Sequence, residues 1–412
     1  MAALPARPRL LALGEPTHGE DVLLDVRNDL FRQLVEEEGY RTIALESDCL
    51  AALTVDAYVT SGADAADAGS TPGGADSTPG GPADPARLDD VMAHGFSHGF
   101  GASPANRELV RWMRAHNEGR APADRVRFAG FDGPLEMSAA QSPRRALTAL
   151  HSHLALRVDA SLLPCTALEL EDLLGEDDPW TDPAVMGDPS RSVGRTPTAE
   201  RLRILTDDLT ALLDAHAPPP EDGREQEERH RARLHARAAT GLLRYHAAMA
   251  DPTPARLARL LTLRASMMAA NLLALAERAP TLVHAHNSHL QRDRSSMTMA
   301  GRRLEWWSAG ALAHSRLGEE YGFVATALGT LRHHGVHEPP PDTVEGLLHA
   351  LPADCFLLDP RHLSAAPASA PPAPRPSPWH GYAPLDPAHL PRMDALVYIK
   401  HIPEGPKWWP TT

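Results

Sequence analysis

The stretch Leu10-Leu11-Ala12-Leu13-Gly14-Glu15-Pro16-Thr17-His18-Gly19 decides the fold. Its first four residues are apolar and predict a short buried strand, and the two glycines allow the backbone to turn sharply after it. Residues 20–38 follow a helical pattern, and a second strand is predicted at 42–45. This succession of strand, turn, helix and strand is typical of α/β proteins.

The rest of the chain continues the same plan. Strand-like runs recur at 10–13, 42–45, 127–131, 281–284, 323–328, 355–358 and 395–399, with helical patterns between several of them, for example at 297–321. Residues 138–279 differ, because Leu and Ala recur there at helical spacing with few β-branched residues. We therefore predict an α/β fold with a mostly parallel sheet flanked by helices.

The predicted sheet is built from two similar halves. Residues 1–135 form the first half, residues 266–412 form the second, and residues 136–265 form a mainly helical region over the cleft. Each half has a strand that ends in a histidine-bearing turn, Glu-Pro-Thr-His at 15–18 and His-Asn-Ser-His at 286–289. Because ligands of open α/β sheets bind outside the carboxyl ends of the strands, both turns lie where a site is expected.

One segment of the first half is low in apolar residues. Residues 61–85 contain Ser-Thr-Pro-Gly-Gly twice among Ala, Asp and Gly. Such a composition cannot bury enough apolar surface to offset its ordering entropy. We predict a mobile surface insertion, and the alternative is a lid over the substrate.

Composition restricts the class of protein. No unbroken apolar run has the roughly 18 residues that span a bilayer, and the apolar stretch at the N-terminus is too short for a signal peptide. The three cysteines are far apart, which fits a reducing cytoplasm. The net charge of −14, without a basic stripe, argues against nucleic acid. We expect a cytoplasmic protein with a small-molecule substrate and no nucleic-acid or membrane partner; the oligomeric state is left open.

The first candidate site is the turn at 14–20. Glu15 and His18 are three residues apart, directly after a buried strand and before a helix whose N-terminus stabilises anionic groups. A carboxylate beside an imidazole can serve general acid–base catalysis. The alternative is a strand-to-helix turn with a surface histidine.

Two further strand ends carry ionisable side chains. Glu46 follows the strand at 42–45, although an acidic residue there is often only a helix cap. His284, His286 and His289 follow the strand at 281. They could ligate a divalent metal with Glu15 or Glu46, or act without metal as an acid, an oxyanion stabiliser and a structural residue.

Other candidates depend on the fold. Gly95-Phe96-Ser97-His98-Gly99 matches the G-x-S-x-G nucleophile elbow, but residues 87–93 before it are not a strand, so we do not expect Ser97 to be the nucleophile. Arg27 and Arg264 could reach the cleft and bind a substrate oxygen, although most arginines of this Arg-rich chain are surface residues.

These segments together resemble the erythromycin esterase family. The matching pieces occur in the family's order at 14–19, 26–32, 44–48, 108–114, 126–132, 264–271 and 285–289. The sequence departs from the family in having Pro16 where Ala or Ser is usual, and in the insertion at 61–85.

The resemblance implies an α/β fold with a helical region over a deep cleft, and hydrolysis of the ester of macrolide lactones. His18 would activate water with Glu15 and Glu46 nearby. His286 and His289, with Arg27 and Arg264, would orient water and substrate or stabilise developing charge.

The leading interpretation is thus a hydrolase of carboxylic esters acting on a macrolide-like lactone or another bulky natural product. The histidine pKa is already near working pH, so no metal or other cofactor is expected, although a divalent metal remains an option. The alternatives are a metal-dependent hydrolase on the same residues, a biosynthetic cyclase, isomerase or acyl-transfer enzyme on the same scaffold, and a binding protein that sequesters a macrocycle.

Overall fold

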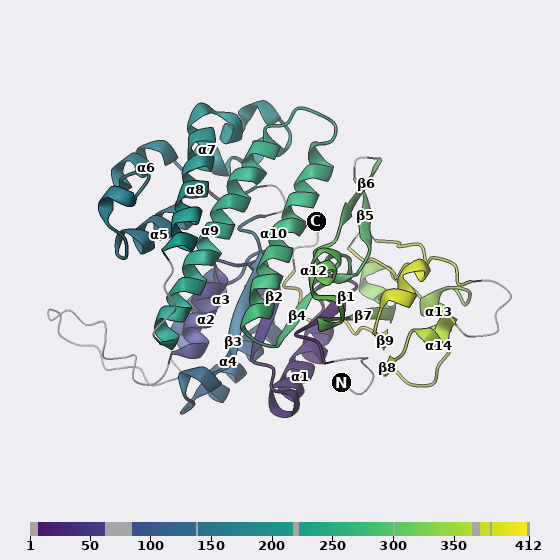
Figure 1. Ribbon diagram of the computed structural model, residues 1–412. Helices are drawn as coiled ribbons and strands as arrows, with labels where there is room; N and C mark the ends of the chain where they lie inside the picture. The colour runs from purple at the N-terminus through teal and green to yellow at the C-terminus, as the bar shows by residue number, and fades with distance from the viewer. Residues whose placement is uncertain are drawn as a thin grey trace.

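The computed structural model describes residues 7–61, 85–136, 139–216, 222–299, 301–364, 371–379 and 381–409. The expectation of a mobile insertion at 61–85 concerns residues that lie almost entirely outside these ranges. Within them, seven strands form one sheet in the order β3-β2-β4-β1-β7-β9-β8 (Figure 1).

Each of the seven predicted strands is present. They are β1 (Leu10–Glu15), β2 (Thr42–Asp48), β3 (Arg127–Asp132), β4 (Thr281–His286), β7 (Tyr321–Thr330), β8 (Cys355–Leu358) and β9 (Ala395–His401). Neighbouring strands are parallel except β8, which runs antiparallel to β9 at one edge. The predicted α/β class, with a mostly parallel sheet flanked by helices, is confirmed.

Helices cover both faces of the sheet, which is why the central strands are buried along their whole length. One apolar core lies between the sheet and helices α1 (Asp21–Glu38), α2 (Ala52–Thr60), α3 (Pro85–His94) and α4 (Pro104–Asn117). The other lies against α10 (Arg256–Arg278), α12 (Ala309–Leu317) and α13 (Val344–His349). At their carboxyl ends, β1 and β4 carry the polar residues Glu15 and His286.

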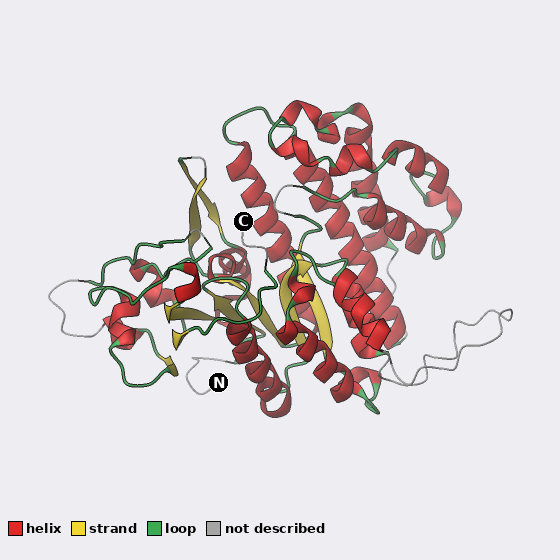
Figure 2. Ribbon diagram, turned by 180° about the vertical axis from the view of Figure 1, so that it is seen from behind, coloured by secondary structure: helices red, strands yellow, loops and turns green. Residues whose placement is uncertain are grey.

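The middle of the chain is helical, as its composition predicts. It contains α5 (Arg144–Ala155), α6 (Ala167–Leu174), α7 (Asp178–Thr181), α8 (Pro197–Ala215) and α9 (Gly223–Met249), which gather on one side of the molecule with α10 (Figures 1 and 2). These helices share their own apolar core. Helix α10 connects them to the sheet, because it packs against both α9 and β3.

Helix α10 has the length and mean hydropathy, 1.3 over 18 residues, of a helix that could cross a membrane, and 44% of that window is buried. The core helix of a folded domain has the same composition, and α10 packs against α9, α12 and β3. Its Arg264 makes ion pairs with two buried carboxylates.

The prediction of a helix over 297–321 is wrong for its first part. After the short α11 (Asn287–Leu290), the chain forms an antiparallel hairpin of β5 (Arg294–Met299) and β6 (Arg302–Trp307), and only α12 is helical. Gly301, with φ 72°, allows the tight turn, and the Arg294 guanidinium lies over the Trp307 ring at 4.8 Å. Such cross-strand contacts stabilise a hairpin, and the spacing of apolar residues along the sequence does not reveal them. A further short helix, α14 (Arg361–Ser364), lies near the C-terminal edge.

The strand order interleaves the two halves of the sequence. β4 lies between β2 and β1 and pairs with both, with Leu13 opposite His284 and Glu15 opposite His286. The carboxyl ends of β1, β2 and β4 therefore meet at one place. The side chains that follow these three strands form the candidate site.

Candidate active site

Two glycines shape the turn after β1. A Cβ on Gly14 would lie 2.1 Å from Asn287 Oδ1, so only glycine allows this close approach to α11. Gly19 has φ 90°, a conformation that glycine adopts at little cost. The chain therefore folds back between β1 and α1, and His18 comes into contact with Glu15.

A buried Glu15 and a partly exposed His18 form a hydrogen-bonded pair. His18 Nδ1 donates to Glu15 Oε1 at 2.7 Å, while His18 Nε2 faces Glu46 Oε2 at 3.9 Å. Burial disfavours the charged form of Glu15, but His284 and His18 outweigh it and lower the pKa of Glu15 to about 2. Burial likewise opposes protonation of His18, but the bond to Glu15 and the charge of Glu46 outweigh it and raise the pKa of His18. Nε2 of His18 is left as the nitrogen that can exchange a proton with water.

His284 and Arg27 lie behind this pair. His284 Nδ1 donates to the carbonyl of Leu13 at 3.0 Å, and its Nε2 is 3.3 Å from Glu15 Oε2 without the alignment of a hydrogen bond. Arg27 Nε and Nη2 both donate to Asn28 Oδ1. His284 and Arg27 are 4% and 1% exposed. Substrate binding by Arg27 and His284 stays a prediction, and the guanidinium of Arg27 places positive charge near Glu15.

Glu46 connects three elements at the end of β2. Its Oε1 accepts from Arg264 Nη2 on α10 at 2.9 Å and lies 3.1 Å from His289 Nε2. Its Oε2 accepts from the backbone N–H of His286 at 3.0 Å. Burial opposes ionisation, but His289, His18 and Arg264 outweigh it, so the pKa of Glu46 lies well below its usual range. Glu46 is thus a permanent negative charge beside His18 Nε2.

His286 has partners on both ring nitrogens. Nε2 donates to the carbonyl of Pro16 at 3.3 Å, and Nδ1 accepts from the backbone N–H of Ser288 at 3.2 Å, which caps α11. Burial, together with the neighbouring His18 and His289, lowers the pKa of His286 to about 4. A neutral His286 therefore ties the His18 turn to α11.

Sequence reasoning missed Asp132 and His98. Asp132 ends β3 and accepts from Arg264 Nε and Nη2 at 3.0 and 2.7 Å. His98 Nε2 lies 3.2 Å from Asp132 Oδ2, and its Nδ1 lies 2.9 Å from Glu136 Oε2. Burial opposes protonation of His98, but these carboxylates outweigh it and raise its pKa to about 9, so His98 is cationic at neutral pH.

A signal for Asp132 was present, because it ends a predicted strand just as Glu46 does. His98 lies in the segment that was analysed only for its serine. It has φ 56°, which is unusual for a residue with a side chain and is typical of functional sites.

Ser97 has a structural role. Its Oγ accepts from the backbone N–H of Asp48 at 2.8 Å, and its own N–H donates to Ser47 Oγ at 2.9 Å. Ser97 is buried and follows helix α3 rather than a strand. These bonds fasten the loop that carries His98 to the end of β2.

Aromatic rings cover one side of His18. The Phe100 and Trp409 rings lie 5.5 and 4.9 Å from the His18 ring, and they contact each other at 4.9 Å. Trp409 belongs to the C-terminal segment, which lines a cavity of about 210 Å³. His18 lines the same cavity. His18, with 21% of its side chain exposed, therefore reaches this cavity under an aromatic cover.

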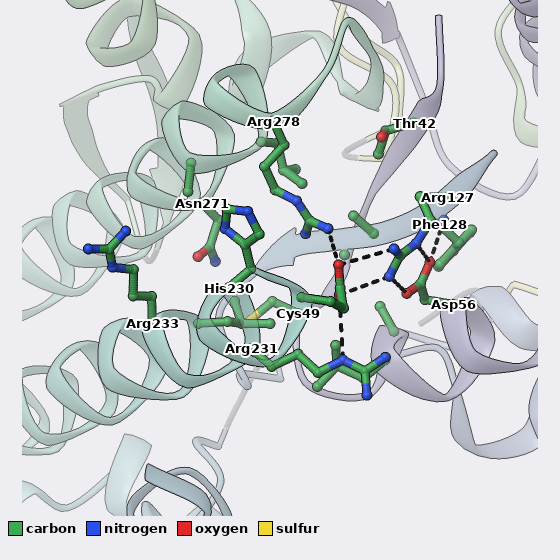
Figure 3. Close-up of a pocket in the computed structure, with 18 of the residues that line it drawn as sticks. Thr42, Cys49, Asp56, Arg127, Phe128, His230, Arg231, Arg233, Asn271 and Arg278 are labelled. Carbon is green, nitrogen blue, oxygen red and sulfur yellow. Dashed lines mark hydrogen bonds and ion pairs between the residues drawn. The ribbon is translucent and has the colours of Figure 1, made fainter. Parts of the chain in front are cut away.

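A second cavity, of about 80 Å³, lies at the amino ends of β2 and β3 (Figure 3). Arg127 pairs there with Asp56 and Glu227, and Arg278 pairs with the same Glu227. These four groups neutralise one another, while Arg231, Arg233 and Arg237 also line the cavity. The carboxyl edge, where His18 Nε2 remains available, is the better candidate for chemistry.

Comparison with known proteins places the chain in a family. The model of the erythromycin esterase family matches residues 35–401, which is most of the sequence. The chain belongs to the erythromycin esterase family. The matched range includes Glu46, Asp132, Arg264, His286 and His289 and begins after the His18 turn. Family membership supports a hydrolase of the esterase type.

Solved structures share the fold of this family member. A Bacillus cereus protein and a succinoglycan biosynthesis protein, 18% and 17% identical, both have a TM-score of 0.63, and 95% of this chain aligns with 88% of each. The erythromycin esterase EreC, as a mutant in its open conformation, is 18% identical with a TM-score of 0.59, over 95% of this chain and 90% of that one. The comparison with curated proteins found no match.

Proposed function

We propose that this member of the erythromycin esterase family hydrolyses a carboxylic ester in a bulky natural product such as a macrolide-like lactone. The observation that supports the proposal is the pair of Glu15 and His18, in which Nδ1 is held by a carboxylate and Nε2 lies at the cavity. A histidine that acts as a general base is commonly oriented in this way, by a carboxylate that accepts a hydrogen bond from its other ring nitrogen.

In the proposed reaction, water attacks the ester carbonyl while its proton passes to His18 Nε2. Glu15 stabilises the imidazolium that forms. The negative charge of the tetrahedral intermediate would be offset by Arg264 and the cationic His98, which share Asp132. The carbon–oxygen bond then breaks, and the departing alcohol takes the proton from His18, leaving a carboxylic acid and an alcohol.

We also propose that hydrolysis does not require a metal, because His18 and the surrounding carboxylates and cations already supply proton transfer and charge stabilisation. After dialysis against a chelator and metal analysis, activity should persist. Loss of activity that a single stoichiometric metal restores would favour the metal-dependent alternative.

The reaction class can be tested with a panel of macrolactones and polyketide esters analysed by mass spectrometry. Hydrolysis adds the mass of one water, and His18→Asn should slow this by at least about 100-fold. An unchanged mass with altered retention would instead indicate an isomerase and would contradict the proposal. Arg332→Gln, at an exposed position, is a matched control that should keep full activity.

A further inference from the structure

A second group of ionisable side chains lies beside the His18 turn. Glu20 precedes α1, and His333 and His334 lie in a short 3-10 helix (Arg332–His334) directly after β7. Because β1 and β7 are neighbouring parallel strands, the segments that follow them meet at the carboxyl edge of the sheet. This group involves none of the residues used in the proposed hydrolysis.

The three side chains converge on one point. Glu20 Oε1 lies 2.9 Å from His333 Nε2 and 3.8 Å from His334 Nε2, and one ligand atom from each residue lies within 4.8 Å of the others. Two ligands of a tetrahedral zinc ion, with bonds of about 2.0–2.1 Å, are about 3.3 Å apart. The two observed separations lie on either side of that value, so small side-chain rotations would place the three ligand atoms around one ion.

The group is also held in place. The His334 ring stacks on Trp379 with centroids 4.0 Å apart and planes at 5°, and the His333 and His334 rings are 4.7 Å apart. The side chains of Glu20, His333 and His334 are 6%, 14% and 20% exposed. Little side-chain entropy would be lost on binding an ion, which favours affinity.

The surroundings favour a cation. Glu20 is adjacent to Asp21 and close to Glu15, and both carboxylates add negative charge near it. The exposed Lys407 lies nearby but pairs with Glu404 at 3.7 Å. A bound metal ion would take the place of the proton now shared between Glu20 and His333, as metal binding commonly does.

We propose that Glu20, His333 and His334 form a three-ligand site for a divalent transition metal, with zinc as the best fit. Two imidazoles and one carboxylate suit zinc, cobalt or nickel better than magnesium or calcium. The same three residues line the 210 Å³ cavity that contains His18, so the fourth coordination position faces the cavity and can take water or a substrate oxygen. The site does not depend on the proposed hydrolysis.

Metal titration of the chelator-treated full chain tests the site. We expect one equivalent of Zn²⁺ to bind with a Kd of about 1 µM or less in calorimetry, and Co²⁺ to give the visible absorption of a four-coordinate ion. Glu20→Gln and His334→Gln should each weaken binding by at least about 100-fold. His337→Gln, exposed in the same loop, is the matched control and should bind as the wild type does.

Circular dichroism should show that each variant is folded, and His333→Gln replaces any variant that is not. His289→Asn tests for binding in the histidine cluster at Glu46 and should leave the affinity unchanged. Three results would overturn the proposal: no binding to the wild type tighter than about 100 µM, binding retained in the Glu20 and His334 variants, or binding lost in His289→Asn alone.

Discussion

Replacing Glu15 with Gln removes one charge from the candidate active site and almost nothing else. The Gln carbonyl can still accept from His18 Nδ1, so the 2.7 Å contact and the ring orientation can persist. What is lost is stabilisation of the imidazolium formed when His18 takes a proton. A hydrogen bond to a charged partner contributes about 1.5–3 kcal/mol, and 1.36 kcal/mol corresponds to tenfold in rate. We therefore expect kcat to fall by about 10- to 100-fold.

The same variant should change the pH dependence. Protonated His18 cannot accept a proton, so activity rises with pH through its pKa. Burial opposes protonation in the wild type, but Glu15 and Glu46 outweigh it and raise the pKa of His18 above its ordinary value. Without the charge of Glu15, the acidic limb of the kcat/KM profile should move to lower pH.

The assay is ester hydrolysis from about pH 5 to 9, with the double variant of Glu15→Gln and His18→Asn as the control. If Glu15 acts through His18, the double variant is no slower than His18→Asn alone. An unchanged kcat together with an unmoved acidic limb in Glu15→Gln would refute the role of this pair.

Three other substitutions probe neighbouring features. Ser97→Ala should keep most activity and lose about 1 kcal/mol of unfolding free energy in urea denaturation. Fluorophosphonates should not label the wild type, and stoichiometric labelling of Ser97 would mean a serine nucleophile. Arg264→Met should cost about 3 kcal/mol of stability, because it leaves two buried carboxylates without their guanidinium; a melting temperature equal to that of the wild type would contradict this. Trp409→Ala should raise kcat/KM more for bulky lactones than for a small aryl ester, because the ring covers His18 at the cavity; equal effects on both substrates would argue against a steric role.

Much of the fold could be predicted because the strands of a doubly covered sheet are marked by composition. The run at 10–13 is apolar, and the ten residues of β7 are all buried and mostly apolar. The hairpin at 294–307 was missed because it packs outside the sheet, and its exposed Met297 and Trp307 gave an irregular apolar spacing. The spacing of apolar residues along a chain reports which face of an element is buried. Most residues of this hairpin are exposed, so its apolar spacing carried little information.

The candidate site was predictable to the extent that parallel strands align their ends. Glu15, Glu46 and His286 each lie at the carboxyl end of a strand, so their convergence could be predicted from the parallel sheet alone. His98 and Trp409 come from a loop and from the C-terminal segment, whose paths depend on tertiary contacts. No local sequence pattern specifies the path of such a segment. His98 could be recognised as part of the site only from its contact with Asp132.

The position of β4 between β1 and β2 has a consequence for biosynthesis. His284 bonds to Leu13 across 271 residues of chain, so the acid–base pair acquires its surroundings only after those further 271 residues have been translated. Until then β1 and β2 have no central partner, and their unpaired edges are open to wrong pairing. Contacts of such long sequence separation also slow folding. A ribosome-bound N-terminal half would therefore depend on chaperones, and two separately expressed halves would have to exchange strands before either could carry a working site.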